Sequence, residues 1–418
     1  MPRTDLITLR APEPPGLLAR VQEAIRSRWS GPLTSNSPEL ARYFGAGPVA
    51  AGVSVTEASA QTNAAVVACI DRISNDVASL PLLVYARRPD DGRERATRHP
   101  VYRLLHDEPN PEQTPMVFRR TLQAHVLLWG NGYAEIERDV MGRPIALWPM
   151  VPDRVQPFRT PAGDLAYRVS NPNGGTVDVP AADMFHLVGR SHDGSVGASL
   201  VTYARESIGL SLAAEQFGAT FYKNGGTLSG VVSNKGPKPT QQAAQGQRDA
   251  DEARHAGIKQ AHKWLQLWND ATFTPITVPP DNAQFLETRQ FQLEEICRWF
   301  SMPPHKIQHL LRATYSNIEQ QSTDYLISCL RPWLVLWEQE CARKLLRPTE
   351  RERFYIEHIT QALLTADAAG RAALYRELFA IGALTPNEAR RLENLNPIPG
   401  GDQAYVSSGM TPIARPQQ

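Results

Sequence analysis

Two histidine pairs are the residues of this 418-residue chain whose spacing most resembles that of metal ligands. His305 and His309 stand four residues apart, a spacing that zinc sites use on a helix. The residues between them include no glutamate that could act as a general base, and the sequence offers no third ligand nearby. We therefore interpret both histidines, together with His255 and His262, as polar surface residues, and we predict no metal and no cofactor.

Two further motifs carry residue types found in active sites. Ser191, His192 and Asp193 are adjacent, but adjacent side chains diverge and a catalytic serine needs a strained, exposed turn, so we expect a loop after a sheet. The run Gly130–Gly132 follows a helical pattern and enters a strand, which is the reverse of the dinucleotide-binding order, and it predicts a helix C-cap. The chain contains no Gly-x-x-x-x-Gly-Lys-Ser/Thr loop. We therefore predict that the protein is not an enzyme.

The composition excludes several other classes of protein. The 44 basic residues nearly balance the 43 acidic ones, whereas a sequence-independent DNA-binding protein normally carries a basic excess. No apolar run approaches the ~20 residues that a transmembrane helix needs, and Pro12, Pro14 and Pro15 interrupt any signal-peptide core. The four cysteines have no CxxC spacing and stand in apolar helical patterns, which favours buried free thiols in a reducing compartment. We expect a soluble intracellular product without membrane contact.

The first half of the chain predicts an α+β domain. Apolar residues recur at helical spacing over Ala64–Leu80, and a second helix is expected over Pro115–Trp129, with Thr114 as its N-cap and Pro115 in its first turn. Short β patterns bounded by turn residues occupy Leu82–Tyr85, Tyr133–Arg138, Ile145–Met150, Val155–Phe158, Tyr167–Val169, Val177–Val179 and Met184–Leu187. Because tight turns separate these strands, we expect antiparallel pairing.

The second half is mainly helical. Helices are expected over Gly197–Lys223, Pro239–Trp268, Asn282–Phe300, Ile318–Leu346, Ala366–Phe379 and Pro386–Leu392, with strands over Ser229–Ser233 and Phe273–Val278. Pro303 and Pro304 form a structural junction, since they cannot propagate the helix that precedes them. Pro332 is expected to kink the long helix in which it stands.

The residues around this junction resemble the HK97-like family of tailed-bacteriophage portal proteins. The similarity extends from about Val53 to Asp402 and is carried by four stretches: Val66–Leu82, Leu128–Ala134, Leu286–Gln321, and Leu384–Arg391 followed by Gly400–Asp402. Ser301, immediately before Met302, departs from the glycine that relatives often carry at that position.

The resemblance implies an α+β portal fold that assembles as a ring. The implied parts of the first half are a flexible N-terminal arm at 1–55, an α+β wing at 56–196 and a first stem helix at 197–224. They are followed by a small α/β clip at 225–281, a second stem helix at 282–302 and a tunnel loop at 303–317. The last parts are a long wing helix and following strand at 318–359, a helical crown at 360–402 and a disordered tail at 403–418.

The implied function is the channel at the unique vertex of a phage or phage-like capsid, through which DNA is packaged and later leaves. The alternative is a capsid-associated head–tail adaptor or scaffold ring that conducts no DNA, and a weaker one is a nuclease or protease of the packaging machinery.

The implied partners are about eleven further copies of the chain in a dodecamer, the terminase large subunit, the major capsid protein, a head–tail adaptor, and double-stranded DNA passing without sequence specificity. The implied location is the portal vertex of the virion, after assembly from the host cytoplasm. A channel must not bind DNA tightly, because a protein that neutralises many phosphates binds DNA too strongly for it to move through. A few cations at the narrowest loop can still centre the duplex, and Lys306, His309 and Arg312 are the candidates; the alternative is that each is a solvated loop residue.

Overall fold

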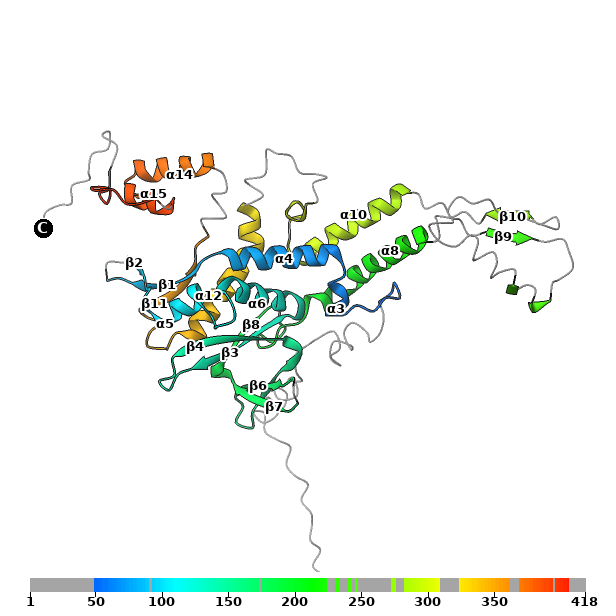
Figure 1. Cartoon of the computed structure of the whole chain (residues 1–418), viewed down its shortest axis with the longest axis horizontal. Helices are drawn as coiled ribbons and strands as arrows, with labels where there is room; N and C mark the ends of the chain where they lie inside the picture. The colour runs from blue at the N-terminus through cyan, green and yellow to red at the C-terminus, as the bar shows by residue number, and fades with distance from the viewer. Residues whose placement is uncertain are drawn as a thin grey trace, which may run out of the picture.

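The computed structural model describes residues 49–89, 92–172, 174–223, 230–233, 240–242, 245–246, 272–275, 282–308, 323–360, 368–393 and 395–405. These residues form an α+β body with a helix pair and a β-hairpin projecting from one end and two short helices near the other end (Figure 1). Most of the expected N-terminal arm, most of the helical stretch 239–268 and the tail after residue 405 lie outside the described residues. Within that described part, no helix is long and apolar enough to cross a membrane.

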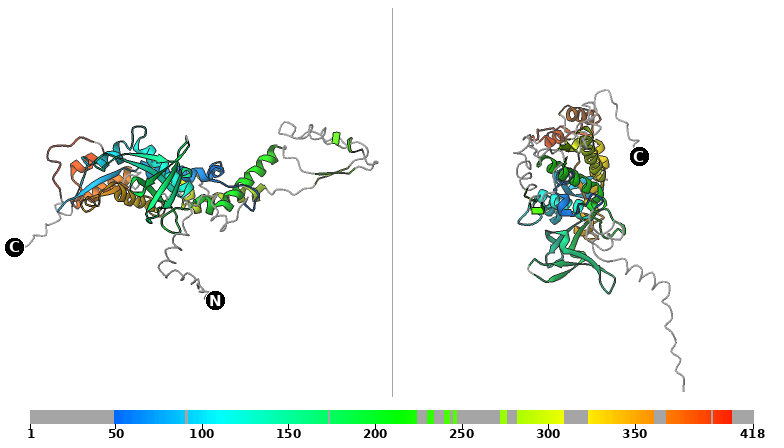
Figure 2. Two further views of the ribbon diagram at one scale, coloured as in Figure 1. Left: turned by 90° about the horizontal axis from the view of Figure 1, so that it is seen from below. Right: turned by 90° about the vertical axis from the view of Figure 1, so that its right-hand side faces the viewer.

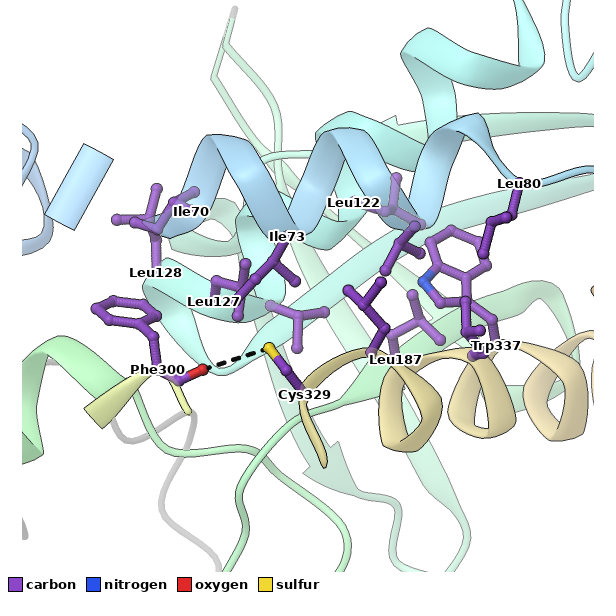
Figure 3. Close-up of a cluster of buried hydrophobic side chains, with 14 of the residues drawn as sticks. Ile70, Ile73, Leu80, Leu122, Leu127, Leu128, Leu187, Phe300, Cys329 and Trp337 are labelled. Atoms are coloured by element: carbon purple, nitrogen blue, oxygen red, sulfur yellow. Dashed lines mark hydrogen bonds between the residues drawn. The ribbon is translucent and has the colours of Figure 1, made fainter. Parts of the chain in front are cut away.

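The centre of the body is a stack of three helices. Helix α4 (Ala64–Ser79) begins at Asn63, whose side-chain oxygen accepts hydrogen bonds from two backbone N–H groups of the first turn. Helix α6 (Pro115–Trp129) has the predicted Thr114 cap and ends at Gly130, whose φ of 75° is left-handed. Figure 3 shows apolar side chains of α4, α6 and the later helix α12 (Arg331–Leu345) meeting in one cluster, with Trp337 fully buried among them.

Three antiparallel sheets surround this helical core. Strands β11 (Phe354–His358), β1 (Leu82–Arg87) and β2 (Arg93–Arg95) form one sheet, so the chain returns to its first strand after more than 250 residues. A second sheet has the order β4 (Pro144–Met150), β3 (Asn131–Arg138), β8 (Met184–Val188). The third contains β5 (Val155–Arg159), β6 (Leu165–Ser170) and β7 (Thr176–Pro180), which pack on the second sheet through a small separate core. The predicted antiparallel pairing is confirmed.

Several short elements connect the strands and helices of this body. They are α3 (Glu57–Ala60), α5 (Pro100–Tyr102), the π-turn η1 (Arg103–Asp107), the 3-10 turns η2 (Pro152–Arg154) and η3 (Ala181–Asp183), and α7 (Leu200–Tyr203).

The projecting part consists of two helices joined through a hairpin. Helix α8 (Arg205–Lys223) leads out of the body, strands β9 (Gly230–Ser233) and β10 (Thr272–Pro275) pair in antiparallel fashion, and α10 (Asn282–Trp299) returns to it. The left view of Figure 2 shows this projection extending to one side of the sheets. Residue Arg289 of α10 approaches Glu215 of α8 at 3.5 Å, so the two helices also contact each other along their length.

The long helix expected over 318–346 differs from the prediction. Residues 318–322 lie outside the described residues, residues 323 and 324 are helical, Tyr325–Leu330 form a π-helical turn, η7, and the α-helix continues from Arg331. Pro332 explains the difference, because its ring would clash with the carbonyl of Ser328 and it cannot donate a hydrogen bond to it. The wider π-turn accommodates the proline within continuous helical backbone.

Helices α14 (Ala368–Ala380) and α15 (Pro386–Leu392) are the last two helices of the described residues. Thr385 and Glu388 form a reciprocal capping box at the start of α15. The side chain of Tyr375 donates a hydrogen bond to Glu393, which ties the two helices together.

Candidate functional site

The junction between α10 and the following segment is built on a left-handed residue. Ser301 has φ of 52°, and Met302 donates a backbone hydrogen bond of 2.8 Å to Cys297, back across the last turn of α10. This is the hydrogen bond of a helix C-cap that normally carries glycine, since glycine adopts φ > 0 without steric cost. Ser301 is therefore a position of the junction where glycine would have a physical advantage.

The two prolines then redirect the chain into a short 3-10 turn. Pro303 is extended, and η5 (Pro304–Ile307) ends at Gln308, a second non-glycine residue with positive φ, 67°. Within the described chain, Ser301 and Gln308 are the two non-glycine residues with left-handed backbone. The turn therefore has a left-handed non-glycine residue at each end, a conformation that costs free energy, with Pro303 and Pro304 between the two.

Lys306 lies against the protein body. Its ammonium nitrogen is 5.3 Å from the centroid of the Tyr325 ring, and the Tyr325 hydroxyl donates a 2.8 Å hydrogen bond to Asp76 of α4. Asp76 also accepts a 2.8 Å hydrogen bond from Arg72. Burial and the nearby Arg72 lower the pKa of Lys306, while Asp76 raises it. The two flanks of the segment 309–322 are therefore joined to each other and to α4.

The other predicted channel residues fall in that segment. His309 and Arg312 lie outside the described residues. His305 is half-buried, its Nε2 atom has no hydrogen-bond partner, and burial lowers its pKa. No group of three or more His, Cys, Asp or Glu that could hold a metal occurs in the part of the chain that the structure describes.

Ser191, His192 and Asp193 form a turn, as predicted. The Asp193 carboxylate accepts hydrogen bonds from the Ser191 hydroxyl at 3.0 Å and from the backbone N–H of Ser195 at 2.9 Å, and these bonds lower its pKa. His192 instead hydrogen-bonds the hydroxyl of Tyr203. Because the serine and the histidine face different partners, the three side chains have no nucleophile–base geometry.

The strongest buried polar network lies where α6 turns into β3. The Asn131 side chain, 1% exposed, donates to the Gly197 carbonyl at 2.7 Å and accepts from the Gly197 N–H at 2.7 Å. It also accepts from His186 Nε2 at 3.0 Å, and the Tyr167 hydroxyl donates to the other ring nitrogen of His186 at 3.0 Å. Burial, with the positive charges of Lys344 and Arg343, lowers the pKa of His186 to about 3, so this imidazole is neutral.

Glycine is required at this turn for close packing. A Cβ at Gly197 would lie 1.8 Å from the carbonyl oxygen of Gly130, and a Cβ at Gly130 would lie 2.4 Å from the backbone of Ala198. The predicted C-cap at Gly130–Gly132 is therefore confirmed, and its glycines and asparagine hold the α6–β3 turn against the start of α7. The sequence gave no signal for the participation of His186 and Tyr167.

A similar arrangement stabilises the C-terminal motif. The buried Asn387 side chain forms two hydrogen bonds with the backbone of Ile398, at 2.8 and 3.0 Å, and a Cβ at Gly401 would meet it at 2.4 Å.

The four cysteines are free and buried, as predicted; burial raises the pKa of the Cys329 thiol to about 12.

Comparison with known proteins places these motifs in a family. A family model described as phage portal protein matches residues 64–394. The portal protein of Enterobacteria phage HK97 is 31% identical over 351 residues, which cover 82% of this chain and 81% of that protein. The probable portal protein of Streptomyces phage phiC31 is 29% identical over 381 residues, covering 86% of this chain and 80% of that protein.

Two solved structures share the fold. The crystal structure of an HK97 family phage portal protein from Corynebacterium diphtheriae matches with a TM-score of 0.57 at 16% identity, over 75% of this chain and 99% of that one. A chain in the neck of a native gene transfer agent particle, computed with C12 symmetry, matches with a TM-score of 0.57 at 20% identity, over 92% of this chain and 100% of that one. The α+β fold predicted from the resemblance is confirmed.

Proposed function

This chain belongs to the phage portal protein family, and on that basis we propose that it forms the ring-shaped DNA channel at the portal vertex of a phage or phage-like capsid. In this proposal the ring admits DNA driven by a separate terminase, releases it later, and receives a head–tail adaptor. The role is structural and involves no catalysis. The observation that carries it is the family match over residues 64–394, which spans the body, the projecting helices and the C-terminal helices.

The geometry of the projecting part supports the proposal. In a channel protein, α8 and α10 would form the stem, the β9–β10 hairpin would lie in the clip, and α14–α15 would belong to the crown. The C12 symmetry applied to a structurally similar neck chain supports a ring of about a dozen subunits.

Exposed apolar side chains on the helices indicate how the ring would close. Leu210 on α8 is 48% exposed, Phe291 on α10 is 55% exposed, and Ile327 in η7 is 56% exposed. Large apolar groups in such positions gain free energy by leaving water, at about 25 cal/mol per Å². A closed ring needs two different complementary faces on each subunit, and we propose that these residues contribute to them.

Ring closure can be measured with purified full-length protein. Native mass spectrometry and electron-microscope class averages should show a closed ring of about a dozen subunits with a central hole. The double substitution Leu210→Ser with Phe291→Ser should shift the protein toward smaller species, whereas Val177→Ser, at a residue 54% exposed on β7, should leave the ring intact. A chain that stays monomeric even with its capsid protein present would contradict the portal proposal and favour the adaptor alternative.

We also propose that the segment beginning at Pro303 faces the channel. Lys306 stands at its base against Tyr325, so His309 and Arg312 are the better candidates for transient contact with DNA phosphates. Particles carrying His309→Gln with Arg312→Gln should show altered genome packaging or retention, whereas Arg168→Gln, in an exposed ion pair on β6, should not. Unchanged genome content in the double variant would exclude these two charges from the channel.

A further inference from the structure

A basic pocket lies at the C-terminal end of α12, away from the junction and the projecting helices. It has a cavity volume of about 360 Å³. We call it the α12 pocket; it is lined by Arg138, Ala181, Ala182, Arg343, Lys344, Leu345, Leu346, Arg347, Pro348 and Arg351. Five of these ten lining residues are cationic and none is acidic.

Backbone carbonyls hold most of these cations in place. Arg138 donates to the carbonyls of Ala182 at 2.9 Å and Lys344 at 3.1 Å, and Lys344 itself donates to the Ala181 carbonyl. Arg351 donates to the Arg343 carbonyl at 2.6 Å. A carbonyl orients a guanidinium but carries no net charge, so these contacts fix the cations without neutralising them.

Carboxylates compensate only part of the charge. Arg138 pairs with Asp183 at 2.9 Å, and Arg343 pairs with Glu340 at 2.8 Å. Burial lowers the pKa of Lys344, and the neighbouring Arg343 and Arg138 lower it further, although Glu340 opposes them. The pocket therefore keeps a positive potential, and an anionic group that entered it would relieve the repulsion among its cations.

The remaining lining residues are apolar. Leu345 and Leu346 are each 2% exposed, so the apolar surface that a ligand could reach in the cavity comes from Ala182 and Pro348, which are exposed, and from the half-buried Ala181. A DNA backbone presents phosphates and sugars along a stiff rod, and would leave this apolar part without a partner. A protein segment that carries a carboxylate beside an aliphatic side chain matches both parts of the pocket.

We propose that the α12 pocket is a docking site for an acidic protein segment, in which an Asp or Glu side chain meets the guanidinium groups and a neighbouring aliphatic side chain packs on Ala182 and Pro348. Arg347 is the most informative residue, because it is exposed and its one side-chain hydrogen bond, to the Met141 carbonyl, is 3.3 Å long. Its replacement should alter the charge of the pocket with little effect on the fold.

The test uses the assembled full-length protein and a fluorescent twelve-residue peptide of alternating Glu and Leu. We expect saturable binding whose affinity falls as the salt concentration rises. The substitution Arg347→Glu should lower the affinity for the peptide about tenfold or more. The variant Arg347→Lys should restore part of the binding. The matched control is Arg376→Glu, on the exposed surface of α14, which should bind the peptide as the parent does. Melting temperatures of all three variants check that the fold is retained.

Three competing outcomes would overturn the proposal. A Gln–Leu version of the peptide that binds equally well would show that the carboxylates are irrelevant. A twelve-base-pair DNA duplex that binds more tightly, and loses binding with Arg347→Glu, would assign the pocket to nucleic acid. Binding of inorganic phosphate without binding of the acidic peptide would reduce the pocket to a small-anion site. Because the readout is peptide binding, it does not depend on whether the ring conducts DNA.

Discussion

Replacing Asn131 by alanine should be among the most destabilising single changes in the body of this protein. The substitution removes the side chain that bonds both the N–H and the carbonyl of Gly197, each at 2.7 Å, and the Nε2 atom of His186 at 3.0 Å. All of these groups are buried. A buried polar group left without a partner costs about 1–3 kcal/mol, and the three losses are not independent, so we expect a total near 3–5 kcal/mol.

Urea denaturation at one fixed protein concentration would measure this loss, because ring assembly makes stability depend on concentration. The control is Asn171→Ala, at an exposed turn residue, which should change the free energy of unfolding by less than about 0.5 kcal/mol. The slope of the transition should be the same in both variants, since they bury similar surface. A loss below about 1 kcal/mol for Asn131→Ala would refute the view that this network holds the α6–β3 turn.

Three further predictions concern backbone conformation and protonation. Ser301→Gly should raise the melting temperature, because a left-handed non-glycine residue costs about 1–2 kcal/mol. An unchanged or lower melting temperature would show that the serine backbone is not strained. Gly197→Ala should prevent folding to the native body, because its Cβ would lie 1.8 Å from the carbonyl oxygen of Gly130. Gly370→Ala, in open space on α14, should be tolerated. Soluble yield and circular dichroism would measure both effects. His186 has a folded pKa of about 3, below its ordinary ~6.5, so the unfolded chain takes up the proton first as pH falls. Its contribution to stability is complete above pH ~6.5 and declines by up to about 1.4 kcal/mol per pH unit toward pH 3, and NMR of a labelled sample should show a neutral imidazole at pH 4.5.

Local signals in the sequence predicted the elements well. Thr114 and Gly130 mark the ends of α6, and Pro81 follows the end of α4, because capping, left-handed conformation and proline geometry act within a few residues. The family resemblance is confirmed, and with it the α+β fold.

Features that depend on distant residues were not predictable. Asn131 bonds Gly197 and His186 of β8, and His186 in turn bonds Tyr167 of β6; the sequence does not specify how these segments pair, so it did not predict the shared network. Lys306 was predicted only as a loop cation, and its place over Tyr325 depends on how η7 packs on α4. The π-turn before Pro332 accommodates the proline in the packed helix, and the sequence did not predict it.

The anchoring of both flanks of residues 309–322 has a consequence for changes in the length of that segment. Because Lys306 contacts Tyr325, and Tyr325 in turn bonds Asp76 on the central helix, the two ends of the segment are held together by residues outside it. The entropy of closing a loop grows only slowly with its length, by about 0.6 kcal/mol for each doubling. Insertions or deletions between the anchors therefore have little effect on the free energy of unfolding.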